Sequence, residues 1–187
     1  SFQQGHNSFL MYTGNSSGIA KNSRFVNNIW NYYELVILYN YPDRNFFMEN
    51  CMFIDNSIQS NIGNLITITA YDELVTLQNC TFYNNELLNE ASLIKVNGSN
   101  APVLITGNNF INTSTVNILS NQISTSVNAE NNYWDVVNNE EIENLIYHYN
   151  DEITLGQVDF SPWLPAPSIT APPIPAQNTI ITSTGND

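Results

Sequence analysis

Apolar residues alternate with polar ones at period two in several short stretches of the chain. Three such pairs are Phe46 and Met48, Val75 and Leu77, and Val103 and Ile105. This period places the apolar side chains on one face of a β-strand. After the first pair, the next apolar residues on the expected inner face are Cys51 and Phe53, three and five positions beyond Met48, so the alternation shifts by one residue. The slip predicts a bend at Glu49 and Asn50, where two short strands meet at an angle.

A short pattern centred on an aromatic ring recurs along the chain. Its rings are Phe25, Phe53, Phe82, Phe110 and Tyr133. They are 28, 29, 28 and 23 residues apart, which is the period of a solenoid repeat. A further apolar stretch, such as 65–68 or 93–96, completes each repeat. Three strands in a turn of roughly two dozen residues predict an all-β parallel β-helix of about five coils, each about 4.8 Å above the last.

Residues at the same place in successive coils become neighbours along the solenoid axis. The five rings are therefore expected to form an internal aromatic stack. Three places after the ring, Asn28, Asn56 and Asn85 are expected to form an Asn ladder, in which each amide bonds the next and tolerates a left-handed turn. The 32 Asn residues of the chain then have a mainly architectural role.

The last part of the β-helix follows a different pattern. Between 139 and 149 the apolar residues recur at helical spacing, behind an N-cap at Asn138 or Asn139 and an acidic first turn. We expect a short helix that covers the C-terminal end of the core. At the other end, 1–20 resembles part of a coil, with Phe9, Met11 and Ile19 available to the core and no capping helix before them.

Beyond Leu164 the composition changes abruptly. Five of the eight Pro fall between Pro165 and Pro175, and Ser and Thr fill much of the remainder. Such a segment is expected to be extended and unpacked. The predicted organisation is a capped β-helix over 1–164 and a linker or stalk, with room for O-glycans, over 165–187.

Several motifs together resemble those of a known superfamily. They are the repeated Asn-Cys-x-Phe-x-Asn-Asn element and the segments 131–134, 142–147 and 156–163. Over residues 20–164 the chain resembles the ends of right-handed β-helix proteins of the pectate-lyase-like superfamily. The resemblance implies the fold, but not one activity, because that superfamily includes lyases, hydrolases, adhesins and surface proteins. Asp135 departs from the pattern, since a Gly commonly follows such a Trp.

The charge balance excludes several classes of partner. Four Lys and Arg face 17 Asp and Glu, which gives a net charge of −13. Such a surface repels phosphate backbones and anionic lipid heads, so neither nucleic acid nor a membrane surface is expected as a partner. No apolar run approaches the roughly 20 residues of a membrane span, so no membrane insertion is expected.

Candidate catalytic groups are few. The resemblance to pectate lyases would require carboxylates that hold Ca²⁺ beside a basic residue, but the basic residues fall in different coils: Lys21, Arg24, Arg44 and Lys95. The motif set of polygalacturonase-like hydrolases is absent. His6 and His148 are expected to be ordinary surface or terminal residues. The acidic residues between 135 and 159 match no Ca²⁺ loop and are expected to be solvated, so no metal, cofactor or catalytic residue is predicted.

Cys51 and Cys80 occupy equivalent places 29 residues apart, so both are expected to face inward in adjacent coils. A separation near the coil spacing of about 4.8 Å is wide for a disulfide, whose Cβ atoms prefer about 3.8 Å. Local adjustment can close that gap, so buried thiols and a disulfide remain equal alternatives. N-glycosylation sequons begin at Asn15, Asn79, Asn97 and Asn112. They fit a secreted eukaryotic protein.

These observations lead to one expected function and one alternative. The first is a non-catalytic structural or adhesive module, extracellular or on the cell surface, in a surface protein or filament. Its partners are expected to be other copies or neighbouring domains that meet the solenoid ends, with glycans as a further class. The alternative is a carbohydrate-binding or polysaccharide-degrading β-helix whose active groove is not evident in this chain. Because the chain begins at Ser1, either a signal has been removed or it is a piece of a longer protein.

Overall fold

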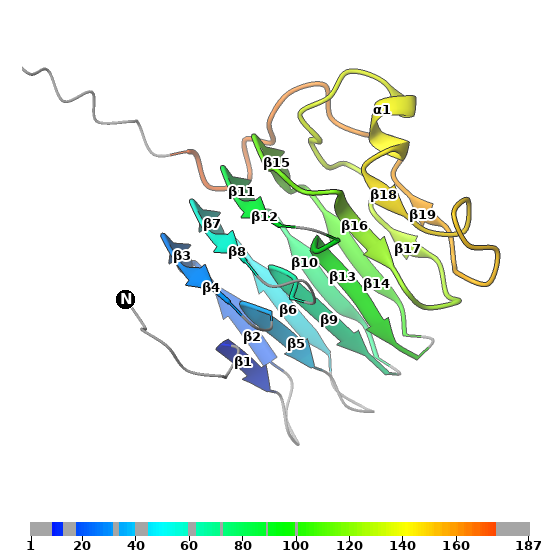
Figure 1. Cartoon of the computed structure of the whole chain (residues 1–187), viewed down its shortest axis with the longest axis horizontal. Helices are drawn as coiled ribbons and strands as arrows, with labels where there is room; N and C mark the ends of the chain where they lie inside the picture. Colours follow the sequence, from blue (N-terminus) through cyan, green and yellow to red (C-terminus); the bar gives the residue numbers. More distant parts are fainter. Residues whose placement is uncertain are drawn as a thin grey trace, which may run out of the picture.

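A computed structural model describes residues 9–12, 18–31, 34–39, 45–59, 63–71, 73–88, 90–99 and 101–174. Over these residues the chain winds into a right-handed parallel β-solenoid of about five turns (Figure 1). The fold class predicted from the repeat period is therefore confirmed. Every recorded strand pairing is parallel, between strands one coil apart.

Four sheets run along the solenoid. Sheet A contains β1 (Phe9–Tyr12), β5 (Val36–Tyr39), β9 (Ile66–Ala70), β13 (Ser92–Gly98), β16 (Asn117–Asn121) and β18 (Ile146–Tyr147). Sheet B contains β2 (Gly18–Lys21), β6 (Phe46–Glu49), β10 (Val75–Gln78), β14 (Val103–Thr106), β17 (Val127–Asn128) and β19 (Val158–Asp159). Sheet C contains β3 (Arg24–Val26), β7 (Met52–Ile54), β11 (Thr81–Tyr83) and β15 (Asn109–Ile111). Sheet D contains β4 (Ile29–Trp30), β8 (Ser57–Ile58) and β12 (Glu86–Leu87).

The middle coils thus contain four strands, not the three that the apolar pattern predicts. The extra strand belongs to sheet D and is two residues long. Only its second residue, Ile58 in β8 and Leu87 in β12, is buried. A single inward side chain produces no alternation, so the sequence pattern does not reveal this strand.

Two corners of each coil adopt left-handed backbone geometry. The corner between sheets B and C is formed by Asn22, Asn50, Asn79, Gly107 and Asn131, and the corner between sheets C and D by Asn27, Asp55, Asn84, Asn112 and Asp135, all with positive φ. The bend predicted at Glu49 and Asn50 lies at the first corner. Left-handed geometry was expected at the ladder residues themselves, but it falls one residue before them. Asp135 needs no Gly, because it occupies a corner that Asn and Asp tolerate.

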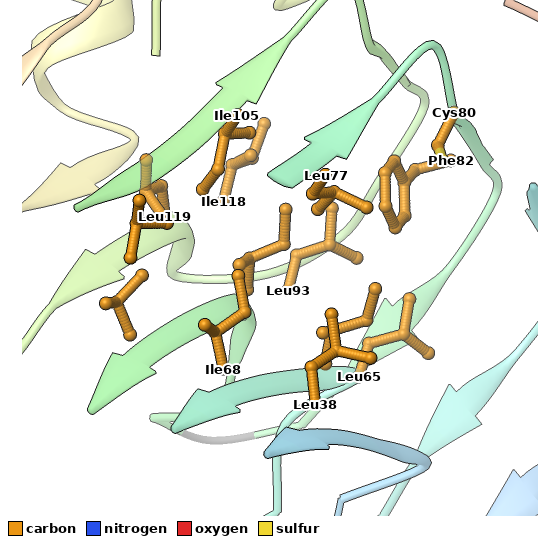
Figure 2. Close-up of a cluster of buried hydrophobic side chains, with 14 of the residues drawn as sticks. Leu38, Leu65, Ile68, Leu77, Cys80, Phe82, Leu93, Ile105, Ile118 and Leu119 are labelled. Carbon is orange, nitrogen blue, oxygen red and sulfur yellow. The ribbon is translucent and has the colours of Figure 1, made fainter. Parts of the chain in front are cut away.

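The lumen is filled by stacked apolar side chains (Figure 2). Phe25, Phe53, Phe82 and Phe110 lie ring over ring, with centroids 4.6, 4.9 and 5.3 Å apart. The prediction that Tyr133 ends this stack is wrong. Trp134 takes the place, with its ring centroid 5.0 Å from Phe110. The bridge between Asn109 and Tyr133 sets this register, so the last spacing is 24 residues and Tyr133 points outward beside Asn109.

Asn28, Asn56 and Asn85 form a hydrogen-bonded column at the start of sheet D. The Asn28 amide donates to Asn56 Oδ1 at 2.8 Å, and the Asn56 amide donates to Asn85 Oδ1 at 2.9 Å. The amide of Asn85 continues to the Phe53 carbonyl. These bonds satisfy polar groups that would otherwise be buried without partners.

The predicted C-terminal helix is shorter than its apolar pattern indicates. Helix α1 spans Asn139–Glu143, and the side chain of Asn138 caps it by accepting the Glu141 N–H. The chain then enters β18, which pairs with β16 as a further strand of sheet A. The apolar residues near 145 and 146 therefore follow the solenoid instead of a helical face. Helix α1 still contributes the fully buried Ile142 to the end of the core.

The first part of the Pro-rich tail is packed, against expectation. Residues 165–174, called the strap below, run back along the solenoid past β15 and β11 (Figure 1). Ser168 N–H donates to Asn109 Oδ1 at 2.6 Å, and the Asn109 amide donates to Ser168 O at 3.1 Å. Outward polar groups on sheet C supply bonding partners that composition alone does not reveal. The stalk predicted over the last residues, 175–187, lies outside the described residues.

Candidate functional site

A row of polar side chains runs along the outer corner between sheets C and D. The amide of Asn112 donates to Asn84 Oδ1 at 2.9 Å, and the amide of Asn84 donates to Asp55 Oδ1 at 2.6 Å. At the other end, Asp135 accepts the backbone N–H of Asn112 at 3.0 Å. All four residues have positive φ at the same corner of successive coils. Their side chains therefore lie one above the other along the solenoid.

This outer row forms one wall of a cleft of about 600 Å³. The cleft lies between the polar row, the start of sheet D and the segment that closes the last coil. Its lining comprises Asp55, Asn56, Ser57, Asn84, Asn85, Glu86, Phe110, Asn112, Thr113, Ser114, Ile118, Trp134, Asp135, Val136 and Leu145. A polar rim thus surrounds an apolar inner surface, an arrangement typical of small-ligand sites.

The lining carries three carboxylates and no basic residue. Asp135 Oδ1 accepts the Tyr133 hydroxyl at 2.9 Å. Burial raises the pKa of Tyr133, and its hydrogen bond to the Asp135 carboxylate and that group's negative charge raise it further. The indole N–H of Trp134 is buried and has no hydrogen-bond partner. The cleft therefore offers carboxylate, amide and hydroxyl groups at its rim, a set suited to binding hydroxyl groups.

The basic residues do not gather at this cleft. Lys21 Nζ lies 2.6 Å from Glu49 Oε2 on sheet B, and Gln78 donates to the other oxygen of Glu49. The hydrogen bond from Lys21, with that from Gln78, lowers the pKa of Glu49. Arg24 is exposed on β3 and Lys95 lies on β13 in sheet A. Arg44 lies outside the described residues.

His148 is not a surface residue, which corrects the interpretation of the sequence. The side chain is 1% exposed, and each ring nitrogen has a partner. Nδ1 accepts the backbone N–H of Val158 at 2.9 Å, and Nε2 lies 2.7 Å from Glu143 Oε1. His148 therefore joins α1 to the start of β19. The turn after β18, which replaces the predicted helix, brings the ring inward. His6 lies outside the described residues.

Cys51 and Cys80 lie in adjacent coils as free, buried thiols. The Cys51 N–H points to Cys80 Sγ at 3.4 Å, and Cys80 N–H donates to Asn108 Oδ1 at 2.8 Å. The column continues through Asn108 to Asn132 as a second amide ladder. A hydrogen bond with Cys80 lowers the pKa of Cys51, whereas burial raises that of Cys80. The pair fills a structural column of small and amide side chains.

The described sequons differ in their surroundings. Asn112 is exposed, and Asn97 is half-buried on β13. Asn79 lies under the strap, where its Oδ1 accepts the Thr170 hydroxyl at 2.8 Å. Asn15 lies outside the described residues. Asn79 and Asn97 are thus both half-buried, and what distinguishes the sequon at Asn79 is its contact with the strap.

No protein-family model, curated protein or solved structure matches the chain. The described residues contain no group of three His, Cys, Asp or Glu arranged to hold a metal ion. Within the same residues, no helix has the length and apolar character needed to cross a membrane.

Sequence reasoning missed the cleft, the buried imidazole and the strap. The cleft depends on the shape of the last coil, where Trp134 replaces a phenyl ring. The imidazole depends on where α1 ends. In the structure, Thr81 and Asn109 are polar yet nearly or fully buried on the outer face of sheet C, and the sequence alone does not reveal that burial. Outward positions of this kind are buried only where another segment covers them.

Proposed function

We propose that the chain is a non-catalytic structural or adhesive module that acts outside the cell and assembles end to end. One observation carries the proposal: the two ends of the described solenoid differ. At the C-terminal end, Trp134 and Ile146 are buried, and Ile142 of α1 is buried in the same core. This end is covered within the chain.

The other end is formed by edge strands. Among the described residues, β2, β3 and β4 are each the last strand of their sheet. The lumen residues there, Phe25 and Trp30, are half-buried, whereas Phe53 and Ile58 in the next coil are fully buried. Ile19, expected in the core, points outward and is 64% exposed, because Ala20 takes the inward place. Unpaired strand edges with apolar side chains favour docking of a further β-layer.

The proposed location and kinship are supported by the sequons and by the fold. The sequon residue Asn112 is exposed, which agrees with a glycosylated extracellular protein. The right-handed β-helix agrees with kinship to the pectate-lyase-like superfamily, a relationship that stays a proposal because fold alone does not establish it. A non-catalytic role agrees with the separation of the basic residues from the acidic cleft.

A charge placed on the edge strand tests end-to-end assembly. Ile29 is the first residue of β4 and is 63% exposed, so Ile29→Lys is expected to leave the fold intact. A lysine on an edge strand opposes pairing with another chain. We expect the association constant, measured by sedimentation equilibrium, to fall about tenfold or more.

The matched control is Val116→Lys, because Val116 is 57% exposed on the side of the solenoid. This variant is expected to associate like the unmodified chain. Equal weakening by both substitutions would indicate a general charge effect. A wild-type chain that stays monomeric at all concentrations would contradict self-assembly, and the edge strands would then need a partner of another kind.

The cleft favours carbohydrate binding as a second candidate function. Its amide, carboxylate and hydroxyl groups bond sugar hydroxyls, and its apolar wall suits the C–H face of a sugar. Incubation with anionic and neutral polysaccharides, read by release of reducing ends or unsaturated products, separates the two candidates. We expect no turnover. Turnover that disappears in Glu86→Gln but persists in Asp159→Asn, an exposed carboxylate on β19, would establish the alternative.

A further inference from the structure

The sequon formed by Asn79, Cys80 and Thr81 lies beneath the strap, and both of its recognition side chains bond to the strap. The Thr170 hydroxyl donates to Asn79 Oδ1 at 2.8 Å. The Thr81 hydroxyl donates to Pro172 O at 2.6 Å, and Thr81 itself is fully buried. The half-buried amide side chain that would receive a glycan and the buried hydroxyl that completes the sequon are therefore both bonded to one segment, 91 residues further along the chain.

The neighbouring coils leave little space around Asn79. A Cβ added to Gly107 would clash with Oδ1 of Asn79, so the Asn79 side chain rests directly on the next coil. Asn50 occupies the same corner in the preceding coil, at a spacing of about 4.8 Å. A group added to the Asn79 amide must therefore extend outward, where Thr170 lies.

The strap is held mainly by polar contacts. Ser168, Thr170 and Pro172 make its four hydrogen bonds to Asn79, Thr81 and Asn109. In the strap, Ala171 is the one buried apolar side chain, and Ile169 is 99% exposed. Each polar bond exchanges readily for a bond to water, so its net contribution is small. We call the surface formed by Asn79, Thr81 and Asn109 the ledge. A bulky group attached to the ledge is therefore sufficient to displace the strap.

We propose that the docked strap and an N-glycan on Asn79 are alternative occupants of this ledge, so that glycosylation at Asn79 releases the strap. The glycan has priority because Asn79 precedes Thr170 in the chain by 91 residues, and it is attached before the strap can dock. The presence of the glycan rests on the proposed extracellular location. The steric exclusion does not, so the two are tested separately.

A chemical substitute for the glycan tests the exclusion in any expression host. The full chain with Asn79→Cys is coupled to a polyethylene glycol maleimide, while the native cysteines stay unlabelled because both are buried. Asn112→Cys is the matched control, because Asn112 also has left-handed geometry, with φ of 46° against 51° at Asn79, and is exposed. Hydrogen exchange of residues 165–174 is then compared by mass spectrometry.

The two labelled chains are expected to differ clearly. Coupling at position 79 should raise the exchange rate of the strap amides about tenfold or more, because the polymer keeps the strap from returning to its docked, protected position. Coupling at position 112 should leave that rate unchanged. A thiol at position 79 that reacts more slowly than the one at 112 also supports the proposal. Equal reactivity at both positions with unchanged strap protection would overturn it.

The glycan itself is tested by expression of the unmodified chain in a glycosylating host. Peptide mapping identifies the occupied sequons, and hydrogen exchange is measured on each separated glycoform. Forms with a glycan at Asn79 are expected to have an unprotected strap, and forms glycosylated at Asn97 or Asn112 alone a protected one. A chain that carries glycans at Asn97 and Asn112 but never at Asn79 would refute release by glycosylation, while the result with the coupled polymer would still decide the steric exclusion.

Discussion

Phe82→Ala is expected to reduce the free energy of unfolding by about 3 to 5 kcal/mol, the range for loss of a large aromatic side chain from a packed core. Phe82 is fully buried and stacks on two rings, with centroids 4.9 Å from Phe53 and 5.3 Å from Phe110. Its removal leaves a void between two coils that the parallel backbone pairings of β11 hold in place. Urea unfolding followed by far-ultraviolet circular dichroism measures the effect.

The control lies at the end of the same column. Phe25 is half-buried and stacks, at 4.6 Å, on Phe53, so Phe25→Ala should cost about half as much or less, since less area leaves water on folding. Phe2→Ala, at the chain start, is also expected to cost less than Phe82→Ala, and Phe2 lies outside the described residues. Equal losses for Phe82→Ala and Phe25→Ala would contradict the central position of Phe82.

The repeat made the fold predictable, because one period fixes every coil. The spacing of the rings and the slip after Met48 reveal sheets B and C and the corner between them. The same logic failed where the period changes. The last repeat is 24 residues long, and alignment on an aromatic ring chose Tyr133 over Trp134. The Asn pair beside them gives the correct register, since Asn132 bonds Asn108 as the next member of the amide ladder.

The candidate site was less predictable than the fold. The cleft and the ledge are formed by residues that are distant in sequence, such as Asp55 and Asp135, or Asn79 and Thr170. Local patterns indicate which face a side chain occupies but not which loop covers that face. The composition of the strap indicated a linker. In the structure, the backbone of the strap forms hydrogen bonds with the side chains of Asn109 and Thr81. Burial of outward polar residues was the missing information.

Substitution of His148 is expected to loosen the C-terminal cap. His148→Ala leaves the Val158 N–H without its acceptor at a buried position and removes one of the two side chains that bond Glu143, the other being Asn150. An unsatisfied buried donor costs about 1 to 3 kcal/mol, and the lost packing adds to this. We expect a total loss of about 2 to 4 kcal/mol in urea unfolding. Exchange of the Val158 amide should rise more than exchange of amides in the middle coils.

Two conservative variants separate the contributions of the ring nitrogens. In His148→Asn the side-chain oxygen can take the place of Nδ1 and accept the Val158 N–H, whereas in His148→Gln the amide can take the place of Nε2 and donate to Glu143. The bond to Val158 is buried, while the Glu143 side chain is 35% exposed. His148→Asn should therefore be the milder substitution. The opposite order would show that the bond to Glu143 holds the cap.

The pH dependence of Glu143 provides the last test of this contact. Burial opposes ionisation of the carboxyl group, but hydrogen bonds from Asn150 and His148 outweigh it, so the pKa of Glu143 lies below its ordinary value of 4.5. A carboxyl group with a lowered folded-state pKa stabilises the protein above its unfolded-state pKa and loses that contribution as the pH falls through the folded-state value. The difference in unfolding free energy between the unmodified chain and Glu143→Gln should therefore be constant near neutral pH and shrink below about pH 4.5. A difference that is unchanged at pH 3 would mean that the carboxylate charge of Glu143 contributes nothing to the stability of the cap.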